Sequence, residues 1–286
     1  MPFLAGEVID GRYQIIEEIG AGGHGTVFRG KDVDLDSDVA IKVLHPEFAQ
    51  DADFAKRMER EARAMGQLAG TSAVQVMAFN RTSAGGMYLV MEYLDGWDLG
   101  RYLYQYEKQS KHLPIDEMIE LLDPIATTLE AAHVRKIIHR DLKLANIFVL
   151  KNRARGRVRL LDFGLVKDMK MPAMTMPGTV AGSPAYIAPE GWRGRPDLVD
   201  HRIDVYSFGV VVYRVLGGRF PFNPDQNLAD IIIEATTKPR PSLLGLRPDL
   251  PAGIDDWVQK ALAIKPAERF QSVQSLWYVL RGLLTP

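Results

Sequence analysis

A short polar segment between two apolar stretches carries the residue types that are most suited to catalysis. Residues 138–146 read Ile-His-Arg-Asp-Leu-Lys-Leu-Ala-Asn, between an apolar helical pattern and the apolar run 147–150. A core histidine or a buried ion pair explains only part of this pattern, because neither accounts for an aspartate, a lysine and an asparagine at this spacing. The segment predicts that Asp141, Lys143 and Asn146 converge in one loop.

A second carboxylate follows the apolar run 158–161. Asp162 begins the sequence Asp-Phe-Gly, and a β-hairpin predicted over 147–161 separates it from the first acidic candidate. A carboxylate at the end of a strand suits a hard cation, because such ions prefer oxygen ligands.

A glycine-rich stretch follows the first predicted strand. Residues 20–27 read Gly-Ala-Gly-Gly-His-Gly-Thr-Val. Glycines at this spacing let backbone N–H groups approach phosphates with no side chain in the way. A dinucleotide-binding fold or a plain hairpin turn could carry the same glycines. Because residues 27–31 read as a strand, and the dinucleotide fingerprint requires a helix there, the phosphate loop and the plain turn remain as alternatives.

One lysine and one glutamate occupy positions where apolar residues are expected. Lys42 ends the strand pattern Val-Ala-Ile-Lys, where a surface lysine is the simpler interpretation. Glu61 lies on the apolar stripe of the helix predicted over 54–68, with Phe54, Met58, Met65 and Leu68. A half-buried carboxylate needs a cationic partner, and Lys42 is the natural candidate.

The elements that position these residues divide into a strand-rich part and a helical part. Residues 1–93 form the first domain, whose strands are predicted over 13–19, 26–31, 38–44, 74–80 and 87–91. After a connector at 92–96, residues 94–286 form the second domain, with helices predicted over 115–133 and 203–216. The second helix is apolar nearly all round, which indicates a buried central helix ended by Gly217-Gly218. The fold class is therefore α+β, with two lobes.

Composition limits the classes of function. The 286 residues are 47% hydrophobic and 25% charged, with a net charge of −1 and no cysteine. These values are typical of a globular protein and argue against nucleic-acid or membrane binding by overall charge. The absence of cysteine excludes disulfides, cysteine-ligated zinc and a catalytic thiol. No secretory signal is visible, and residues 205–216 are too short to span a bilayer, so we expect a cytosolic segment.

The motifs in their order resemble the protein kinase family. The set is Gly-Ala-Gly-Gly-His-Gly-Thr-Val, Val-Ala-Ile-Lys, Glu61, His-Arg-Asp-Leu-Lys-Leu-Ala-Asn, Asp-Phe-Gly and Ala-Pro-Glu at 188–190. The resemblance spans about Tyr13 to Leu280. Two features resemble the Ser/Thr branch of the family: Lys143, two residues after Asp141, and the stretch Gly-Ser-Pro-Ala-Tyr at 182–186. The doubled glycine at 22–23 resembles the bacterial members of that branch. The implied fold is the two-lobed kinase fold, with an antiparallel-sheet N-lobe and a larger helical C-lobe.

The resemblance implies a role for each catalytic candidate. Lys42, held by Glu61, would contact the α- and β-phosphates of ATP, and Asn146 with Asp162 would bind Mg²⁺. Asp141 would orient the attacking hydroxyl and accept its proton, while Lys143 neutralises charge on the transferring phosphoryl group.

The resemblance also implies a nucleotide site. The loop with Gly20, Gly22 and Gly25 would cover the triphosphate. Adenine would lie between Ile19, Val27 and Ala40 on one side and Phe148 on the other. The backbone of Glu92 and Leu94 would bond its edge. Asp98 would meet the ribose, and a helix N-cap is the alternative for this residue.

Other matches are interpreted as structural or regulatory. Asp204 would tie the catalytic loop to the central helix, and Glu190 with Arg269 would form a buried ion pair. The basic residues from Lys151 to Arg159 are interpreted as a solvated turn. Thr179 is the expected activating phosphosite, and Thr175 is interpreted as a solvated loop residue. Leu144-Ala145 replaces the family's usual Pro-Glu, so a preference for arginine-rich substrates does not follow.

The expected function is a protein Ser/Thr kinase that uses ATP and Mg²⁺, with protein substrates and autophosphorylation of its own activation segment, for which two copies would pair. A pseudokinase scaffold is the main alternative, and a small-molecule phosphotransferase is a third class. The complete set Lys42, Glu61, Asp141, Asn146 and Asp162 argues against the scaffold. The stretch 182–190, which resembles a peptide-docking loop, argues against the small-molecule enzyme.

Overall fold

The computed structural model divides the chain into two compact units, residues 1–95 and 96–286. It describes residues 4–23, 25–49, 52–82, 85–154, 156–163, 184–193 and 199–285. The backbone alone is described for Ala49, Ala52, Asp53, Arg57, Glu61 and Arg193. None of the helices in these ranges combines the length and the apolar character needed to cross a membrane.

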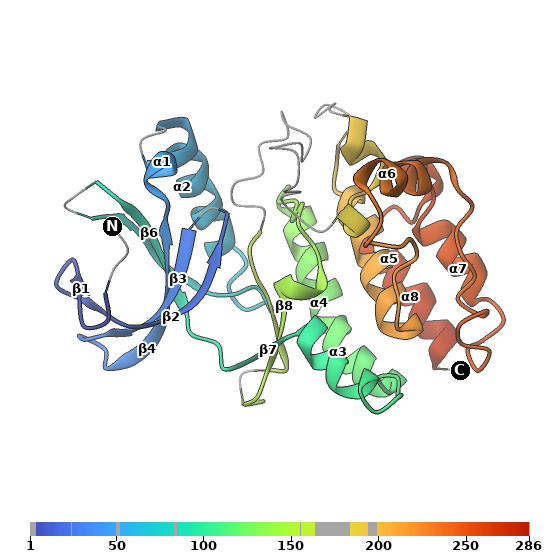
Figure 1. The fold of residues 1–286 in the computed structure, drawn as a ribbon, viewed down its shortest axis with the longest axis horizontal. Helices are drawn as coiled ribbons and strands as arrows, with labels where there is room; N and C mark the ends of the chain where they lie inside the picture. The colour runs from blue at the N-terminus through green and yellow to red at the C-terminus, as the bar shows by residue number, and fades with distance from the viewer. Residues whose placement is uncertain are drawn as a thin grey trace. The chain divides into compact units, whose positions relative to one another are not determined.

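Unit 1 is a six-stranded antiparallel sheet with one long helix (Figure 1). Its elements are β1 (Val8–Ile9), β2 (Tyr13–Gly22), β3 (Gly25–Asp32), β4 (Ser37–Leu44), α1 (Pro46–Ala49), α2 (Ala52–Gly66), β5 (Val76–Arg81) and β6 (Met87–Glu92). The strands lie in the order β1-β2-β3-β4-β6-β5. The predicted strands and helix are all present, and the two-residue strand β1 is additional.

The core of unit 1 follows from the alternation of its strands. Side chains of alternate residues share one face of a sheet, and that face is apolar in the central strands. The buried cluster consists of Ile9, Tyr13, Ile15, Phe28, Val39, Ile41, Tyr88 and Val90. On α2, the predicted stripe residues Phe54, Met58 and Met65 are buried. The helix α2 packs against β5 of the same unit. Burial of the apolar stripe therefore fixes which face of α2 points toward the sheet.

Unit 2 is mainly helical, with a small three-stranded sheet in the order β7-β8-β9. Its elements are β7 (Gly96–Asp98), α3 (Leu99–Glu107), α4 (Ile115–Val134), η1 (Leu144–Asn146), β8 (Ile147–Leu150), β9 (Val158–Leu160), η2 (Pro184–Tyr186), η3 (Pro189–Arg193), α5 (Arg202–Gly217), α6 (Leu228–Thr237), α7 (Ile254–Ala261), η5 (Pro266–Glu268) and α8 (Val273–Leu284). The sequence does not reveal β7, because three residues are too few for an alternating pattern.

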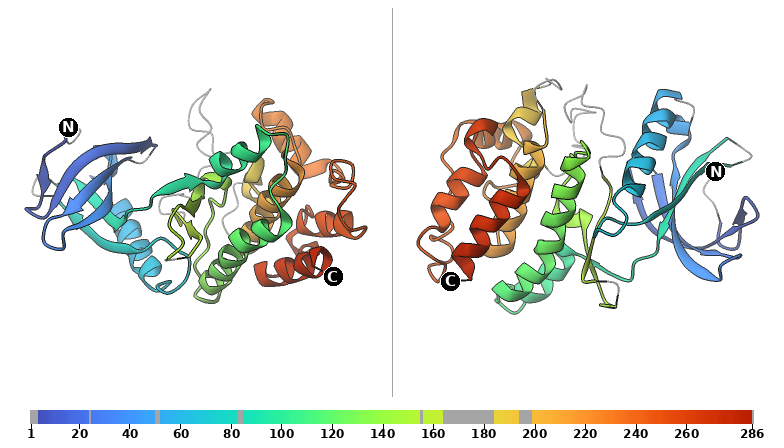
Figure 2. Two further views of the ribbon diagram at one scale, coloured as in Figure 1. Left: turned by 90° about the horizontal axis from the view of Figure 1, so that it is seen from below. Right: turned by 180° about the vertical axis from the view of Figure 1, so that it is seen from behind.

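The helix α5 is the centre of unit 2 and contacts α4, α7 and α8 (Figure 2). Nearly all its side chains are buried, as its uniformly apolar sequence predicts. It ends at Gly218, which has a φ of +72° and donates its N–H to Arg214 O. Glycine adopts this left-handed conformation without steric cost, so the predicted helix end is confirmed.

The hairpin between β8 and β9 corrects one expectation. The interpretation of residues 151–159 as a solvated turn is wrong for Arg157, whose side chain is only 9% exposed. Its guanidinium nitrogens lie 2.8 Å from Glu117 Oε1 and 2.7 Å from Glu120 Oε2. Both acids are on α4. Arg157 therefore fixes the hairpin to α4, because a planar guanidinium can bond two carboxylates at once.

Candidate active site

One buried aspartate holds residues 138–146, called the catalytic segment below, in place. Asp204, in the first turn of α5, is fully buried. It accepts hydrogen bonds from the backbone N–H groups of His139 and Arg140, at 2.7 and 2.9 Å, and interacts with His133 Nε2 at 2.7 Å. Burial alone would raise the pKa of Asp204, but the bonds to His133 and His139 lower it. The predicted link between the loop and the central helix is confirmed.

His139 connects this segment to the strand that leads to Asp162. Its Nε2 lies 2.9 Å from Leu161 O, and its Nδ1 accepts from the Asp141 N–H at 3.3 Å. A carbonyl oxygen only accepts, so the ring carries its hydrogen on Nε2. Burial lowers the pKa of His139, which agrees with a neutral ring. The ring also packs on Phe163, with centroids 4.7 Å apart.

The three side chains expected to converge lie together. Lys143 Nζ is 2.8 Å from Asp141 Oδ2. Asn146 Nδ2 donates to the Asp141 carbonyl oxygen at 2.7 Å and to Oδ2 at 3.2 Å. The side chains of Asp141 and Lys143 are about one-fifth exposed (20% and 21%), so both charged groups are partly open to solvent. The arrangement presents a carboxylate to a hydroxyl with a cation beside it.

Asp162 is placed next to Asn146 by the backbone. The Leu161 N–H donates to the Asn146 carbonyl oxygen at 2.8 Å, which joins the end of β9 to the catalytic segment. Asn146 turns its amide nitrogen toward Asp141, so its amide oxygen faces away from that residue. Asp162 follows Leu161 directly, so its carboxylate and the Asn146 amide oxygen would form an all-oxygen donor pair.

That donor pair fits Mg²⁺. Magnesium binds through one or two protein oxygen ligands and completes its shell with water and phosphate oxygens. No cluster of three or more His, Cys, Asp or Glu that could hold a metal occurs among the described residues. Two oxygen donors would be enough to hold such an ion beside phosphate groups.

Two residues beside these side chains have a strained backbone. Arg140 has a φ of +63° and Asp162 a φ of +44°, both in the left-handed region that non-glycine residues avoid. Such conformations cost roughly 1–3 kcal/mol each and persist only where the surroundings hold them. The hydrogen bond from the Arg140 N–H to Asp204 is one such restraint. Two of the six described non-glycine residues with a positive φ thus lie in or beside residues 138–146.

In unit 1, strand pairing brings several nucleotide candidates to one face of the sheet. Val27 pairs with Lys42 across β3 and β4, and with Gly20 across β2 and β3. Residues directly opposite each other in an antiparallel pair point to the same face, as does Ala40, two residues before Lys42. Ala40 is buried, whereas Ile19 is 47% exposed.

The glycines of the loop at 20–25 differ in whether close packing requires them. A Cβ at Gly25 would lie 2.1 Å from the Val43 carbonyl oxygen, so the β3–β4 contact requires glycine there. Around Gly20 and Gly22 a Cβ would meet nothing within 4 Å. The fold does not require these two glycines by close packing, which leaves their backbone accessible to a ligand.

The pairing of Lys42 with Glu61 stays a prediction. Lys42 lies on β4 and is half-buried. Glu61 belongs to α2, but its side chain is outside the described part of the chain. Thr175, Thr179 and the stretch 182–183 lie outside the described residues as well.

The remaining nucleotide candidates lie at the end of β6, in the connector after it, and on β7 and β8. Glu92 is fixed by Gln75, which accepts from its N–H and donates to its carboxylate, both at 2.9 Å. Leu94 is half-buried in the connector. Asp98 pairs with Phe148 across β7 and β8, and it caps α3 by accepting from the Arg101 N–H at 2.9 Å. The alternative role predicted for Asp98, the N-cap, is therefore present.

Sequence reasoning did not single out Tyr186 as a site residue. Its hydroxyl accepts from the Leu144 N–H at 3.4 Å, and its carbonyl oxygen accepts from Ser207 Oγ at 2.8 Å. Burial raises the pKa of Tyr186 to about 12. These contacts join the Ala-Pro-Glu region to the catalytic segment. Because the partners are far apart in the sequence, no local pattern reveals them.

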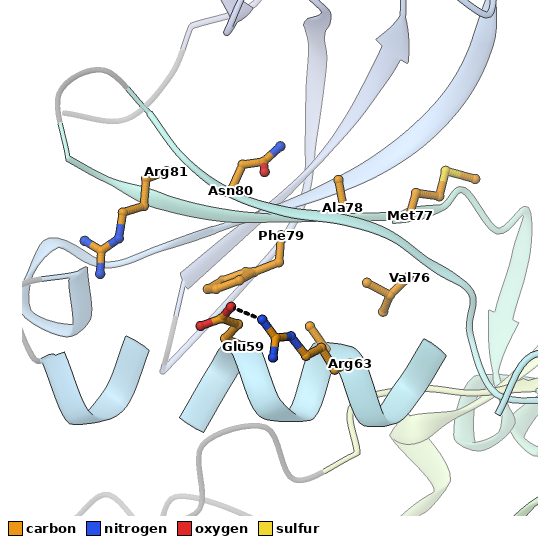
Figure 3. A pocket seen from close by; sticks show the side chains of 9 residues that line it. Glu59, Arg63, Val76, Met77, Ala78, Phe79, Asn80 and Arg81 are labelled. Atoms are coloured by element: carbon orange, nitrogen blue, oxygen red, sulfur yellow. Dashed lines mark hydrogen bonds and ion pairs between the residues drawn. The ribbon is translucent and has the colours of Figure 1, made fainter. Parts of the chain in front are cut away.

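A cavity of about 530 Å³ in unit 1 is separate from these residues (Figure 3). It lies between α2 and β5, with Phe79 and Val76 on the side of β5 that faces the helix. Glu59 and Arg63 form an exposed ion pair of 2.6 Å at its edge. None of the predicted site residues lines this cavity, so it lies apart from the expected nucleotide site.

Known proteins share both the sequence and the fold. A family model described as "Protein kinase domain" matches residues 13–277. The chain is 35% identical over 277 residues to serine/threonine-protein kinase Pkn1 of Myxococcus xanthus, covering 96% of this chain and 38% of that protein. It is 30% identical over 273 residues to serine/threonine-protein kinase PrkC of Bacillus subtilis (strain 168), covering 96% and 40%. The chain thus spans about two-fifths of these relatives' length.

The crystal structure of the PknI kinase domain of Mycobacterium tuberculosis has the same fold. The TM-score is 0.75 at 26% identity, and the match covers 99% of this chain and 100% of that one.

Proposed function

The chain belongs to the protein kinase family, and from this membership we propose that it transfers the γ-phosphoryl group of ATP to Ser or Thr hydroxyls of proteins. The observation that carries the proposal is the convergence of Asp141, Lys143 and Asn146 in unit 2, with Asp162 directly after the residue whose N–H bonds to Asn146. Residues 1–93 would bind the nucleotide, and residues 94–286 would supply the catalytic loop, the activation segment and the substrate-docking surface.

Each residue of the site would act mainly by position and charge. Asp141 would orient the substrate hydroxyl and accept its proton through a carboxylate oxygen. Lys143, 2.8 Å from that carboxylate, would stabilise negative charge as the phosphoryl group moves. Asn146 and Asp162 would hold Mg²⁺, which when bound neutralises charge on the phosphates. Turnover on the order of 1–100 s⁻¹ is typical of this chemistry.

Incubation with radiolabelled ATP, Mg²⁺ and casein tests the proposal against its two alternatives. Incorporation of phosphate into casein supports a protein kinase. Nucleotide binding without labelling of any protein would indicate a scaffold. Phosphate transfer only after addition of a small hydroxylated acceptor would indicate a small-molecule phosphotransferase. A cytosolic site of action and the pairing of two copies stay predictions from the sequence.

Replacing Lys42 or Glu61 is expected to slow transfer about 10²–10³-fold, comparable with loss of one preorganised donor at a charged transition state. If the two residues act as one unit, the variant Lys42→Met/Glu61→Gln should be little slower than the slower single variant. Steady-state rates of all three variants measure this coupling. Losses that multiply in the double variant would contradict a working pair.

Thr179 is expected to be autophosphorylated. A phosphate adds about −1.5 to −2 charges and can accept bonds from arginines, and the exposed Arg140, directly before Asp141, is the candidate partner. Mass-spectrometric mapping after incubation with ATP should find this phosphate, and Thr179→Ala should clearly reduce activity. Full activity of Thr179→Ala, with no phosphate between residues 162 and 190, would refute this regulation.

A further inference from the structure

A histidine just beyond β4 is tied to the glycine-rich loop. His45 Nε2 lies 3.0 Å from the carbonyl oxygen of Gly22, the last residue of β2. Because a carbonyl oxygen only accepts, the histidine must donate through an Nε2–H. In the sheet, β3 lies between β2 and β4, so this bond reaches across the beginning of β3.

The bond supports a part of the loop that packing does not hold. A Cβ at Gly20, Gly22 or Gly23 would meet nothing within 4 Å, so on that side nothing packs against the loop, and Gly20 and Gly22 are held through their pairing with β3 and the bond to His45. At Gly25, by contrast, the β3–β4 contact is so close that it excludes a Cβ. The loop is thus closely packed at Gly25 and loosely packed at Gly22. Glycine loses more conformational entropy on ordering than any other residue, so an added restraint at Gly22 has a larger effect.

We propose that His45 is a positioning residue that holds the glycine-rich loop in its extended hairpin form, ready to cover the phosphates of a nucleotide. This inference rests on the proposed function. His45 acts through the backbone carbonyl group of Gly22, and both residues belong to unit 1. The residues Asp141, Asn146 and Asp162 belong to unit 2. His45 therefore affects how tightly the nucleotide binds and leaves the rate of the bound complex unchanged.

Two variants separate the hydrogen bond from the shape of the side chain. His45→Leu removes the donor, and His45→Gln keeps an N–H at a similar reach. One hydrogen bond to a partly exposed group changes an equilibrium about 3- to 10-fold. We expect His45→Leu to raise both the KM for ATP and the calorimetric Kd for MgADP by that factor, with kcat within about twofold of the wild type. His45→Gln should recover most of the loss.

His201 offers a matched control. Its Nε2 lies 2.9 Å from the Gln271 carbonyl oxygen, so it makes the same kind of exposed bond in unit 2. His201→Leu should leave the KM for ATP and the Kd for MgADP unchanged. Amide hydrogen exchange of residues 20–23 should speed up in His45→Leu and stay at the wild-type rate in His201→Leu.

Three results would overturn the inference: unchanged nucleotide affinity in His45→Leu, equal weakening in His45→Gln, or a fall in kcat with KM unaltered. The Kd for MgADP keeps the test separate from the proposed function. A wild-type chain that binds MgADP but labels no protein refutes the proposed kinase activity, while the Kd values of the variants still decide the role of His45. A wild-type chain that binds no nucleotide refutes both.

Discussion

Asp141→Asn is expected to lower phosphoryl transfer at least about 100-fold, the scale of losing a general base. The amide has nearly the same shape as the carboxylate, so it can keep an oxygen facing Lys143 and Asn146, which lie 2.8 and 3.2 Å from Asp141 Oδ2. It cannot accept the hydroxyl proton at neutral pH. The fold and the affinity for MgADP should therefore persist while transfer fails.

The rate of phosphate incorporation and the Kd for MgADP, measured on the same preparations, check this prediction. Asp116→Asn is the matched control, because Asp116 is an exposed carboxylate in the first turn of α4. It should retain wild-type transfer. Labelling by Asp141→Asn at a rate close to the wild type would remove Asp141 from the mechanism.

The residues of the catalytic segment could be predicted because their spacing along the chain is short. Asp141, Lys143 and Asn146 lie within six positions, so one short loop that ends in η1 brings them together. The family resemblance predicted two buried contacts, and the structure confirms both. One joins Asp204 to the catalytic segment, and the other joins Glu190 to Arg269. Composition alone would not have paired residues so distant in the sequence.

Other contacts between distant segments could not be predicted from the sequence. Arg157 was expected to be solvated because it stands in a basic turn, yet Glu117 and Glu120 on α4 bury it. His45 follows an ordinary strand and is polar, which predicts nothing about a loop more than twenty positions earlier. In both cases the partner is chosen by strand and helix packing, which a local pattern of residue types does not encode.

Arg269→Met is expected to destabilise the protein by about 3–5 kcal/mol, because it leaves a buried carboxylate without its counter-charge. The Arg269 side chain is fully buried, and Glu190 is 5% exposed. Two guanidinium nitrogens donate to the two Glu190 carboxylate oxygens at 2.7 and 2.6 Å. Without Arg269, the Glu190 carboxylate stays buried and loses the two charge-assisted bonds that compensate it.

The arginine also satisfies three backbone carbonyl groups. Its nitrogens lie 2.7 Å from Ala263 O, 3.1 Å from Ile264 O and 3.1 Å from Arg202 O. The last of these belongs to the first residue of α5, so Arg269 joins the central helix to the segment before α8. Arg269→Lys should also be destabilising, because an ammonium group cannot make this fork of bonds in one plane.

Urea unfolding of the full chain measures the effect, with Arg281→Met as the matched control. Arg281 Nη1 is 2.8 Å from Asp123 Oδ1, but both side chains are exposed, at 48% and 41%. A pair in water contributes only about 0–1 kcal/mol, so the free energy of unfolding should change little in the control. An equally small change in Arg269→Met would contradict the assignment.

The double variant Arg269→Met/Glu190→Leu sharpens the test. It removes the uncompensated charge together with its partner, so it should be more stable than Arg269→Met alone, even though more of the native interaction is gone. Stability would then depend on keeping the carboxylate and the guanidinium together, not on the number of bonds that Arg269 makes. If the double variant instead lost the sum of the two single effects, the carbonyl contacts of Arg269 would be its main contribution.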